Sequence, residues 1–246
     1  MEFRKKELVY IIVAAIIAGF VFSFDEWGSE AFNPKIGIIN LISSTIICLI
    51  IYLAHSFSQK LVAKKSDCRI EFDLVTIEKI PIINRKIPKW FSPIGPIITL
   101  LITIISNGKL FFIALASFKL KVKRAYRVGH RWTNVKGIEE ATIAAAGPIS
   151  DITMMVLFKL LMPLSQQFFS KAVFIASALA IFHMLPFPKF DGIKILVESK
   201  TLYLFIISII VLIILFTQII NTLAALMLAI ILAGIISFQY LYKSKS

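Results

Sequence analysis

The run GIINLISSTIICLIIYLAHSF, residues 37–57, decides the class of protein to which this chain belongs. It contains no Asp, Glu, Lys or Arg, and its length matches the roughly 20 apolar residues that a helix needs to cross a bilayer. Its last turn contains a histidine, His55. An ionisable side chain is costly inside a membrane, so it is a functional candidate by default. The run therefore predicts a transmembrane helix with a candidate site residue at one end.

Further apolar runs of similar length extend this interpretation to the whole chain. Hydrophobic residues make up 58% of the sequence, so a water-soluble fold would have to expose much of its apolar surface. Six transmembrane helices are predicted, at residues 8–24, 37–57, 141–161, 170–187, 201–220 and 222–241. The first run follows basic residues, as a signal peptide would, but no small-x-small cleavage site follows it, and we expect it to remain as an anchor. The fold class predicted is an all-α, multi-pass membrane protein.

The distribution of basic residues predicts how the chain is oriented. Short loops rich in Lys and Arg stay on the cytoplasmic side of a cell membrane. With the N-terminus inside, the basic residues fall mostly in inside segments, and the first outside loop carries Asp25, Glu26 and Glu30 with only Lys35. Six spans then place both termini in the cytoplasm. The net charge of +13 is ascribed to lysines beside the spans that face lipid headgroups, so we expect the bilayer, and not nucleic acid, as partner.

The stretch 66–140 has a different pattern from the rest of the chain. Apolar and polar residues alternate at 69–74 and 119–123, which predicts two short strands. Between them, the apolar pieces 94–106 and 110–118 are each too short to span comfortably, and the turn signal Asn107-Gly108 joins them. These pieces predict a re-entrant hairpin, and two short helices packed on the bundle fit the pattern equally well.

The chain is predicted to form one membrane domain, residues 1–246, because no repeat and no long polar linker divides it. Its parts are the first two spans (1–65), the strand and hairpin insert (66–140), a pair of core spans (141–200) and a C-terminal helical pair (201–246).

The first candidate site lies at the end of the second span. His55 and Gln59 are one helical turn apart, so their side chains project from one helix face. An H-E-x-x-H motif presents two histidines to zinc by this geometry, and its glutamate acts on the bound water. Here Ser56 stands in the glutamate position and Gln59 in that of the second histidine. The alternative is a lone structural histidine near the membrane interface.

The second candidate site is the segment FHMLPFPKFDG, residues 182–192. Pro186 and Pro188 are expected to end the fourth span, and Asp191 on the broken segment can then reach a neighbouring helix. The predicted topology puts Asp191 on the same side of the membrane as His55. The alternative interpretation of Asp191-Gly192 is a surface turn.

The third candidate site is the segment AAAGPISD, residues 144–151, which enters the third span. Its small residues permit helices to approach closely, and Asp151 needs a partner. The alternative is a tight packing seam in which Asp151 is a first-turn aspartate that accepts hydrogen bonds from helix amides.

In this order, the three segments resemble the site-2 protease family of intramembrane zinc metalloproteases, in particular its compact archaeal and bacterial members. Such proteins carry H-E-x-x-H near the end of one span, an A-G-P-x-x-N segment entering a later span, and N-x-L-P-x-P-x-x-D-G after the next. The resemblance covers most of the chain. It implies a zinc ion held by two histidines and the late aspartate, a glutamate as general base, and a peptide substrate unwound within the membrane.

Carried over to this sequence, the resemblance implies His55 and Asp191 as zinc ligands. Catalytic zinc ordinarily has three protein ligands, and the candidates for the third are Gln59, His183 and Asp151. His183 and Asp151 both stand where the family pattern has asparagine. The remaining matched positions are expected to pack against the site or the substrate: Gly147, Pro148, Asp151, Pro186 and Pro188.

These substitutions predict a catalytically impaired protein. General-base assistance typically contributes ~10²–10⁴-fold, and a serine at position 56 cannot accept a proton near neutral pH. The leading hypothesis is a pseudoprotease that binds transmembrane or membrane-proximal segments of other proteins, with zinc bound weakly or not at all. The alternative is an atypical active zinc metallopeptidase. A transporter of small solutes or ions is a third hypothesis, since intramembrane His and Asp residues and broken spans suit it as well.

Overall fold

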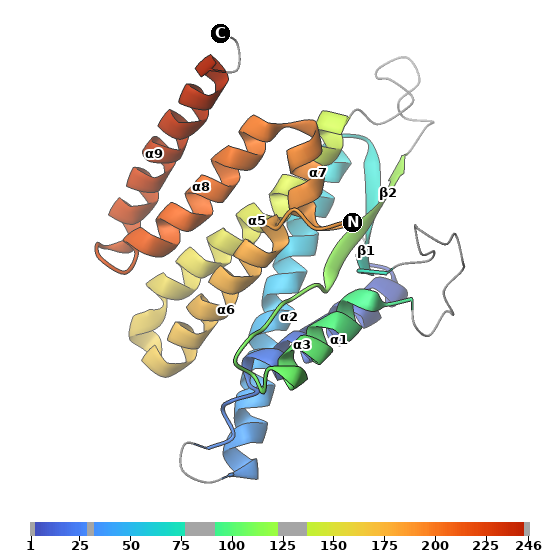
Figure 1. Ribbon diagram of the computed structural model, residues 1–246, viewed down its shortest axis with the longest axis vertical. Helices are drawn as coiled ribbons and strands as arrows, with labels where there is room; N and C mark the ends of the chain where they lie inside the picture. The colour runs from blue at the N-terminus through green and yellow to red at the C-terminus, as the bar shows by residue number, and fades with distance from the viewer. Residues whose placement is uncertain (1–2, 29–31, 77–91, 123–136, 244–246) are drawn as a thin grey trace. The chain divides into compact units, whose positions relative to one another are not determined.

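The structure is a computed structural model of the chain, and it describes residues 3–28, 32–76, 92–122 and 137–243 (Figure 1). The described residues are mostly helical, with one short 3-10 helix (η1) and one sheet of two strands. In chain order the elements are α1 Lys5–Phe22, α2 Pro34–Lys65, β1 Cys68–Leu74, α3 Ile94–Ile105, β2 Ala116–Val122, α5 Gly137–Leu160, η1 Met162–Leu164, α6 Gln166–Met184, α7 Asp191–Glu198, α8 Lys200–Phe216 and α9 Thr222–Lys243.

Four of the described helices are long and apolar enough to cross a membrane, namely α2, α5, α6 and α9. This supports the interpretation as a helical membrane protein. The other two runs predicted as spans also form helices, but α8 has only 17 residues, and the 18 residues of α1 include Lys5, Lys6 and Glu7. The second span is longer than predicted, because α2 continues for 32 residues and carries His55 well inside a helix.

The chain divides into two compact units. The first comprises residues 1–53 and 70–119, and the second comprises residues 54–69 and 120–246. Helix α2 contributes its first part to one unit and its last turns, from Ala54 onward, to the other. All candidate site residues belong to the second unit.

In the first unit, α1 packs against α3, and the start of α1 is tied to strand β1. The buried Glu7 accepts a hydrogen bond from the Phe72 backbone N–H at 3.0 Å and another from the Arg4 backbone N–H at 2.7 Å. Arg4 also forms an ion pair with Glu71 at 2.6 Å. The two predicted strands are confirmed, since β1 and β2 are hydrogen-bonded neighbours.

The predicted turn between α3 and β2 is confirmed, but the alternative of two short helices is wrong for the second piece. Asn107 and Gly108 have φ angles of 51° and 76°, in the left-handed region that favours glycine. The chain then runs without helix into β2, and the Leu115 carbonyl accepts a hydrogen bond from the N–H of Val75, the residue that follows β1. Thr99 of α3 accepts the Ala114 N–H at 3.0 Å. That the hairpin is re-entrant stays a prediction.

In the second unit, α5 packs mainly against α6 and α7, and α8 lies beside α9 (Figure 1). Helix α5 begins at Gly137, earlier than predicted, with Glu139 and Glu140 in its first turn, where the helix dipole favours negative charge. Asp151 consequently lies about four turns into the helix. The alternative of a first-turn aspartate capping helix amides is therefore wrong.

The predicted break after the fourth span is confirmed. Helix α6 ends at Met184, Pro186 and Pro188 follow, and α7 begins at Asp191. A β-carbon added at Gly192 would collide with the Met184 carbonyl, so the start of α7 approaches the end of α6 too closely for a larger residue. The break turns the chain back so that Asp191 points into the helical unit and not into a surface turn, and its side chain is buried.

Candidate metal centre

Helix α2 supplies one side of a buried polar cluster. His55 and Gln59 lie one turn apart on α2 and are only 1% and 2% exposed. Ser56, between them in sequence, is also buried, and its hydroxyl oxygen has no hydrogen-bond partner among the described residues. The helix thus presents a histidine and an amide to the protein interior, as their spacing predicts.

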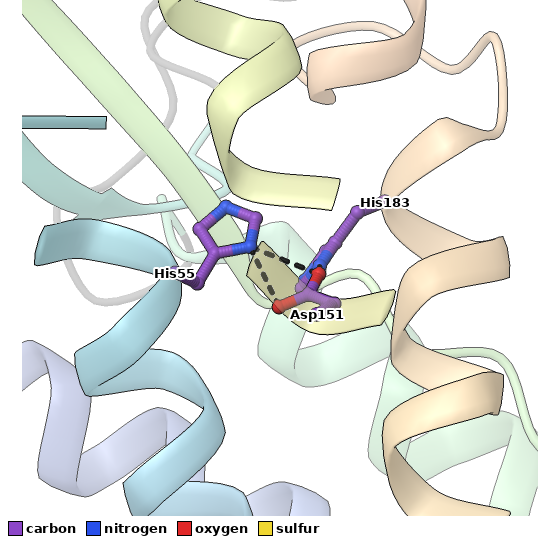
Figure 2. Close-up of side chains that lie close together, drawn as sticks. All are labelled: His55, Asp151 and His183. Carbon is purple, nitrogen blue, oxygen red and sulfur yellow. Dashed lines mark hydrogen bonds and ion pairs between the residues drawn. The ribbon is translucent and has the colours of Figure 1, made fainter. Parts of the chain in front are cut away.

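Asp151 of α5 lies between two histidines (Figure 2). Its two carboxylate oxygens are 3.1 and 3.0 Å from Nδ1 of His55. One of them is also 2.6 Å from Nδ1 of His183, on α6. The two imidazole rings tilt by 60° with their centroids 4.4 Å apart. Asp151, which is wholly buried, therefore joins residues of α2 and α6.

Asp191 contacts the opposite side of His55. Its Oδ2 is 3.0 Å from Nε2 of His55 and accepts a hydrogen bond of 2.9 Å from the Gln59 amide. Its Oδ1 is buried without a hydrogen-bond partner among the described residues. The five side chains form one connected chain, from His183 through Asp151, His55 and Asp191 to Gln59. Residues from the three segments that the sequence singled out thus meet in one place.

Gly147 of α5 makes room for this cluster. A β-carbon at position 147 would collide with the His55 ring and come within 2.7 Å of the Gln59 amide nitrogen. The next residue, Pro148, is inside the helix and has no N–H to donate to the preceding turn. Pro186 and Pro188 are not part of the cluster, and their contribution is the break that lets Asp191 reach it.

Two carboxyl groups are buried in the cluster, Asp151 and Asp191. Ionised Asp151 and Asp191 would place two negative charges among buried side chains, and a buried charge without a counter-charge is strongly unfavourable. Lys194 on α7 is a weak source of positive charge, because burial lowers the pKa of its ammonium group, with Lys189 acting in the same direction and Asp191 and Glu140 opposing it. Protonation of a histidine, protonation of one of the carboxylates and a bound metal ion would each reduce the net negative charge of the site.

The donor set fits a divalent transition metal. His55, Asp151 and His183 each offer one ligand atom, and these atoms all lie within 4.8 Å of one another. Zinc binds imidazole nitrogen and carboxylate oxygen at about 2.0–2.2 Å, which places ligand atoms roughly 3.3–3.5 Å apart in a tetrahedron. The 3.0 Å contact of His55 Nδ1 with Asp151 needs a small adjustment to reach that separation, and the 2.6 Å contact of His183 Nδ1 with Asp151 needs a larger one. Asp191 lies at the other ring nitrogen of His55, Nε2. A carboxylate on the second ring nitrogen is also the usual way in which a ligating histidine is oriented.

Two side chains of α2 stand where the resemblance drawn from the sequence would place a glutamate and a second histidine. The first is Ser56, whose hydroxyl group does not take up a proton near neutral pH. The second is Gln59, which donates an amide hydrogen to Asp191. The resemblance implied His55 and Asp191 as ligands, with Gln59, His183 and Asp151 as candidates for the third. In the structure Asp151 contacts both His55 and His183, whereas Asp191 contacts His55.

Comparison with protein-family models finds no family that matches the chain, and comparisons with curated proteins and with solved structures likewise find no match.

Proposed function

We propose that this chain is a multi-pass membrane protein of the site-2 protease type with a rebuilt metal centre, and that it binds membrane segments of other proteins without cutting them. The six predicted spans and the cytoplasmic position of both termini are part of this proposal. The rebuilt centre consists of His55, Asp151 and His183, with Asp191 beside them. When bound there, zinc would act as a Lewis acid that polarises a carbonyl group.

The observation that carries the proposal is the convergence of the three motif segments. His55 is separated from Asp151 by 96 positions and from Asp191 by 136, yet its two ring nitrogens contact both carboxylates. The resemblance drawn from the sequence requires such a meeting of the first and last segments. The convergence also gives a role to two of the four departures from the family pattern. His183 and Asp151 offer an imidazole nitrogen and a carboxylate oxygen near His55, where Gln59 has no imidazole to offer.

The loss of proteolysis follows from the residues around His55. Removal of a general base typically lowers a rate ~10²–10⁴-fold, and Ser56 offers no replacement.

A second candidate, an active metallopeptidase of unusual design, is favoured by one observation. Oδ1 of the buried Asp191 has no hydrogen-bond partner among the described residues, and a carboxylate oxygen of this kind is a candidate base.

The proposal is tested by the zinc content of the purified protein. The full chain is purified in detergent and dialysed against a buffer that contains a trace of zinc. The zinc bound per chain is then measured by elemental mass spectrometry. About one zinc per chain is expected for the wild type, with clear loss in His55→Ala and His183→Ala, because each removes a donor. Gly234→Ala is the matched control, since a β-carbon at Gly234 meets nothing within 4 Å.

A cleavage assay on a synthetic transmembrane peptide separates the two candidates. No cleavage by the zinc-loaded wild type is expected. Cleavage that disappears in Asp191→Asn would favour the active metallopeptidase instead. A wild type that is folded but binds no zinc would contradict the rebuilt centre altogether.

A further inference from the structure

The two ring nitrogens of His55 face different elements of the second unit. Nδ1 lies 3.1 and 3.0 Å from the two carboxylate oxygens of Asp151, on α5 (Figure 2). Nε2 lies 3.0 Å from Oδ2 of Asp191, the first residue of α7. A histidine that binds a metal ion does so through one ring nitrogen and donates the N–H of the other nitrogen to an acceptor. His55 can therefore bind a single ion on the Asp151 side or on the Asp191 side, but not on both.

The donors for a metal ion gather on the Nδ1 side of His55. One oxygen of Asp151 is also 2.6 Å from Nδ1 of His183. Among the described residues, the group of three whose ligand atoms all lie within 4.8 Å of one another is His55, Asp151 and His183, and Asp191 is not a member of it. An ion that uses Nδ1 of His55 consequently has a carboxylate and a second imidazole nearby. These are three protein ligands, the number usual in open zinc sites.

The Nε2 side of His55 is closed by packing and by hydrogen bonds. A β-carbon at Gly147 would collide with Nε2 and Cε1 of His55, so this edge of the ring lies against the backbone of α5. Gln59 lies on the same side and donates an amide hydrogen to Oδ2 of Asp191 at 2.9 Å. The NH₂ group of Gln59 faces Asp191 because a carboxylate oxygen accepts hydrogen bonds. A donor N–H thus stands where a second imidazole would offer a lone pair to an ion.

Oδ2 of Asp191 is held as a hydrogen-bond acceptor for His55. This oxygen accepts the amide hydrogen of Gln59 and is equally close to Nε2 of His55. Asp191 lies in the first turn of α7, where the helix dipole favours a carboxylate. The N–H of the contact between the two residues therefore belongs to Nε2 of His55. The lone pair that His55 offers to a metal ion is then on Nδ1.

We infer that Gln59 and Asp191 form an orienting pair, which keeps the N–H of His55 on Nε2 and directs Nδ1 to a divalent metal ion held together with Asp151 and His183. The inference rests on the proposed function, since it assigns roles within the proposed metal centre. Asp191 is then a positioning residue and not a ligand. Gln59 is the residue that decides on which side of His55 the ion binds.

The role of Asp191 is tested on the full chain in detergent, with cobalt(II) as the probe. The visible absorption bands of bound cobalt(II) report which atoms bind the ion. Asp191→Asn should weaken cobalt and zinc binding by about 10–100-fold, the usual cost of a lost partner of a ligating histidine. At saturating cobalt its absorption bands should match those of the wild type. Gly234→Ala is the matched control and should change neither property, since its β-carbon meets nothing within 4 Å.

Gln59→Met tests the other member of the orienting pair. The change removes the amide group and keeps an unbranched side chain of similar length. Asp191 then loses one of the two donors to its Oδ2, and its hold on His55 is weaker. Metal binding should fall by less than in Asp191→Asn, with the cobalt bands again unchanged.

Gln59→His gives the sharper test, because it places a second imidazole one helical turn from His55 on the Nε2 side. The ion should then move to Nε2 of His55 with Asp191 as a ligand, and the cobalt bands should change. The dependence on the two carboxylates should also cross over. In the wild-type background, Asp151→Asn should weaken zinc binding by more than about 100-fold, beyond the effect of a positioning residue. In the Gln59→His background, Asp191→Asn should have the larger effect and Asp151→Asn the smaller.

Two outcomes would overturn the orienting pair and leave the metal centre in place. One is a change of the cobalt bands in Asp191→Asn, which would make Asp191 a ligand, for instance through its Oδ1. The other is a Gln59→His variant that still depends more on Asp151 than on Asp191. Thermal unfolding identifies variants that do not fold. Gln59→Met and Gln59→His keep both carboxylates, so their cobalt bands decide the question if Asp191→Asn does not fold.

Failure of the proposed function has a different signature. A folded wild type that binds neither zinc nor cobalt overturns the metal centre and the role of Asp191 together. Cleavage of a transmembrane peptide by the zinc-loaded wild type, with the cobalt bands unchanged in Asp191→Asn, overturns the loss of proteolysis and supports the orienting pair.

Discussion

Helices α5 and α9 have similar lengths and are both apolar enough to cross a membrane, yet they have opposite surroundings in the second unit. In the most apolar window of α5, 61% of the residues are buried, against 22% in α9. Helix α9 buries only Ala225, Ala229, Ala233 and Ser237, one residue per turn. Helix α5 buries Asp151 and the residues around it on several sides. Hydropathy alone therefore identifies a span, and the placement of small and polar residues decides how much of it faces protein.

The largest effect is expected from Asp151→Ala in α5. The change leaves two buried histidines without the carboxylate that contacts both of them. Removal of one partner from a buried ionic group typically costs about 3–5 kcal/mol. We expect a large fall in the thermal unfolding temperature and loss of bound zinc.

Asp151→Asn is the matched control for Asp151→Ala, because it keeps the shape of the side chain and one acceptor oxygen. It should be less destabilising than the alanine variant. Equal stability of Asp151→Ala and the wild type would show that the cluster does not hold α2, α5 and α6 together.

An intermediate effect is expected from Gly147→Ala in α5, compared with Gly234→Ala in α9. The added methyl group at position 147 meets the His55 ring and the Gln59 amide, whereas at position 234 it meets nothing within 4 Å. Overpacking of this kind typically costs about 1–3 kcal/mol. The thermal unfolding temperature and the zinc content should both fall in Gly147→Ala. In Gly234→Ala both should stay at or above the wild-type level. Equal behaviour of the two glycines would mean that the His55 side chain does not lie against α5.

The smallest effect is expected from Met227→Ala on the exposed face of α9. This side chain is 67% exposed, so its truncation should change the free energy of unfolding by less than about 0.5 kcal/mol. The measurement is denaturant or thermal unfolding in the same detergent as for the α5 variants. A loss of more than about 2 kcal/mol would mean that another molecule covers this face, and the contrast between the two helices would then not hold.

The sequence by itself determined the class of protein and the positions of most helices. Length and hydropathy are local properties, so most apolar runs were located to within a few residues, although α2 continues well past its predicted end to Lys65. Helices α2, α5, α6 and α9 support the membrane assignment. The strands β1 and β2, the turn at Asn107-Gly108 and the break after Met184 were also predicted, because alternation, glycine and proline act on the chain locally. The first turn of α5 was misplaced, since polar residues such as Glu139 favour a helix start that a search for apolar residues overlooks.

Only the tertiary structure decided which side chains meet. The spacing of His55 and Gln59 predicted a shared helix face, but no pattern within one segment shows that Asp151 lies between His55 and His183, because these residues come from three helices. Local interactions set the helices, and long-range packing of small residues such as Gly147 sets the site, because only packing determines which faces come within reach of each other.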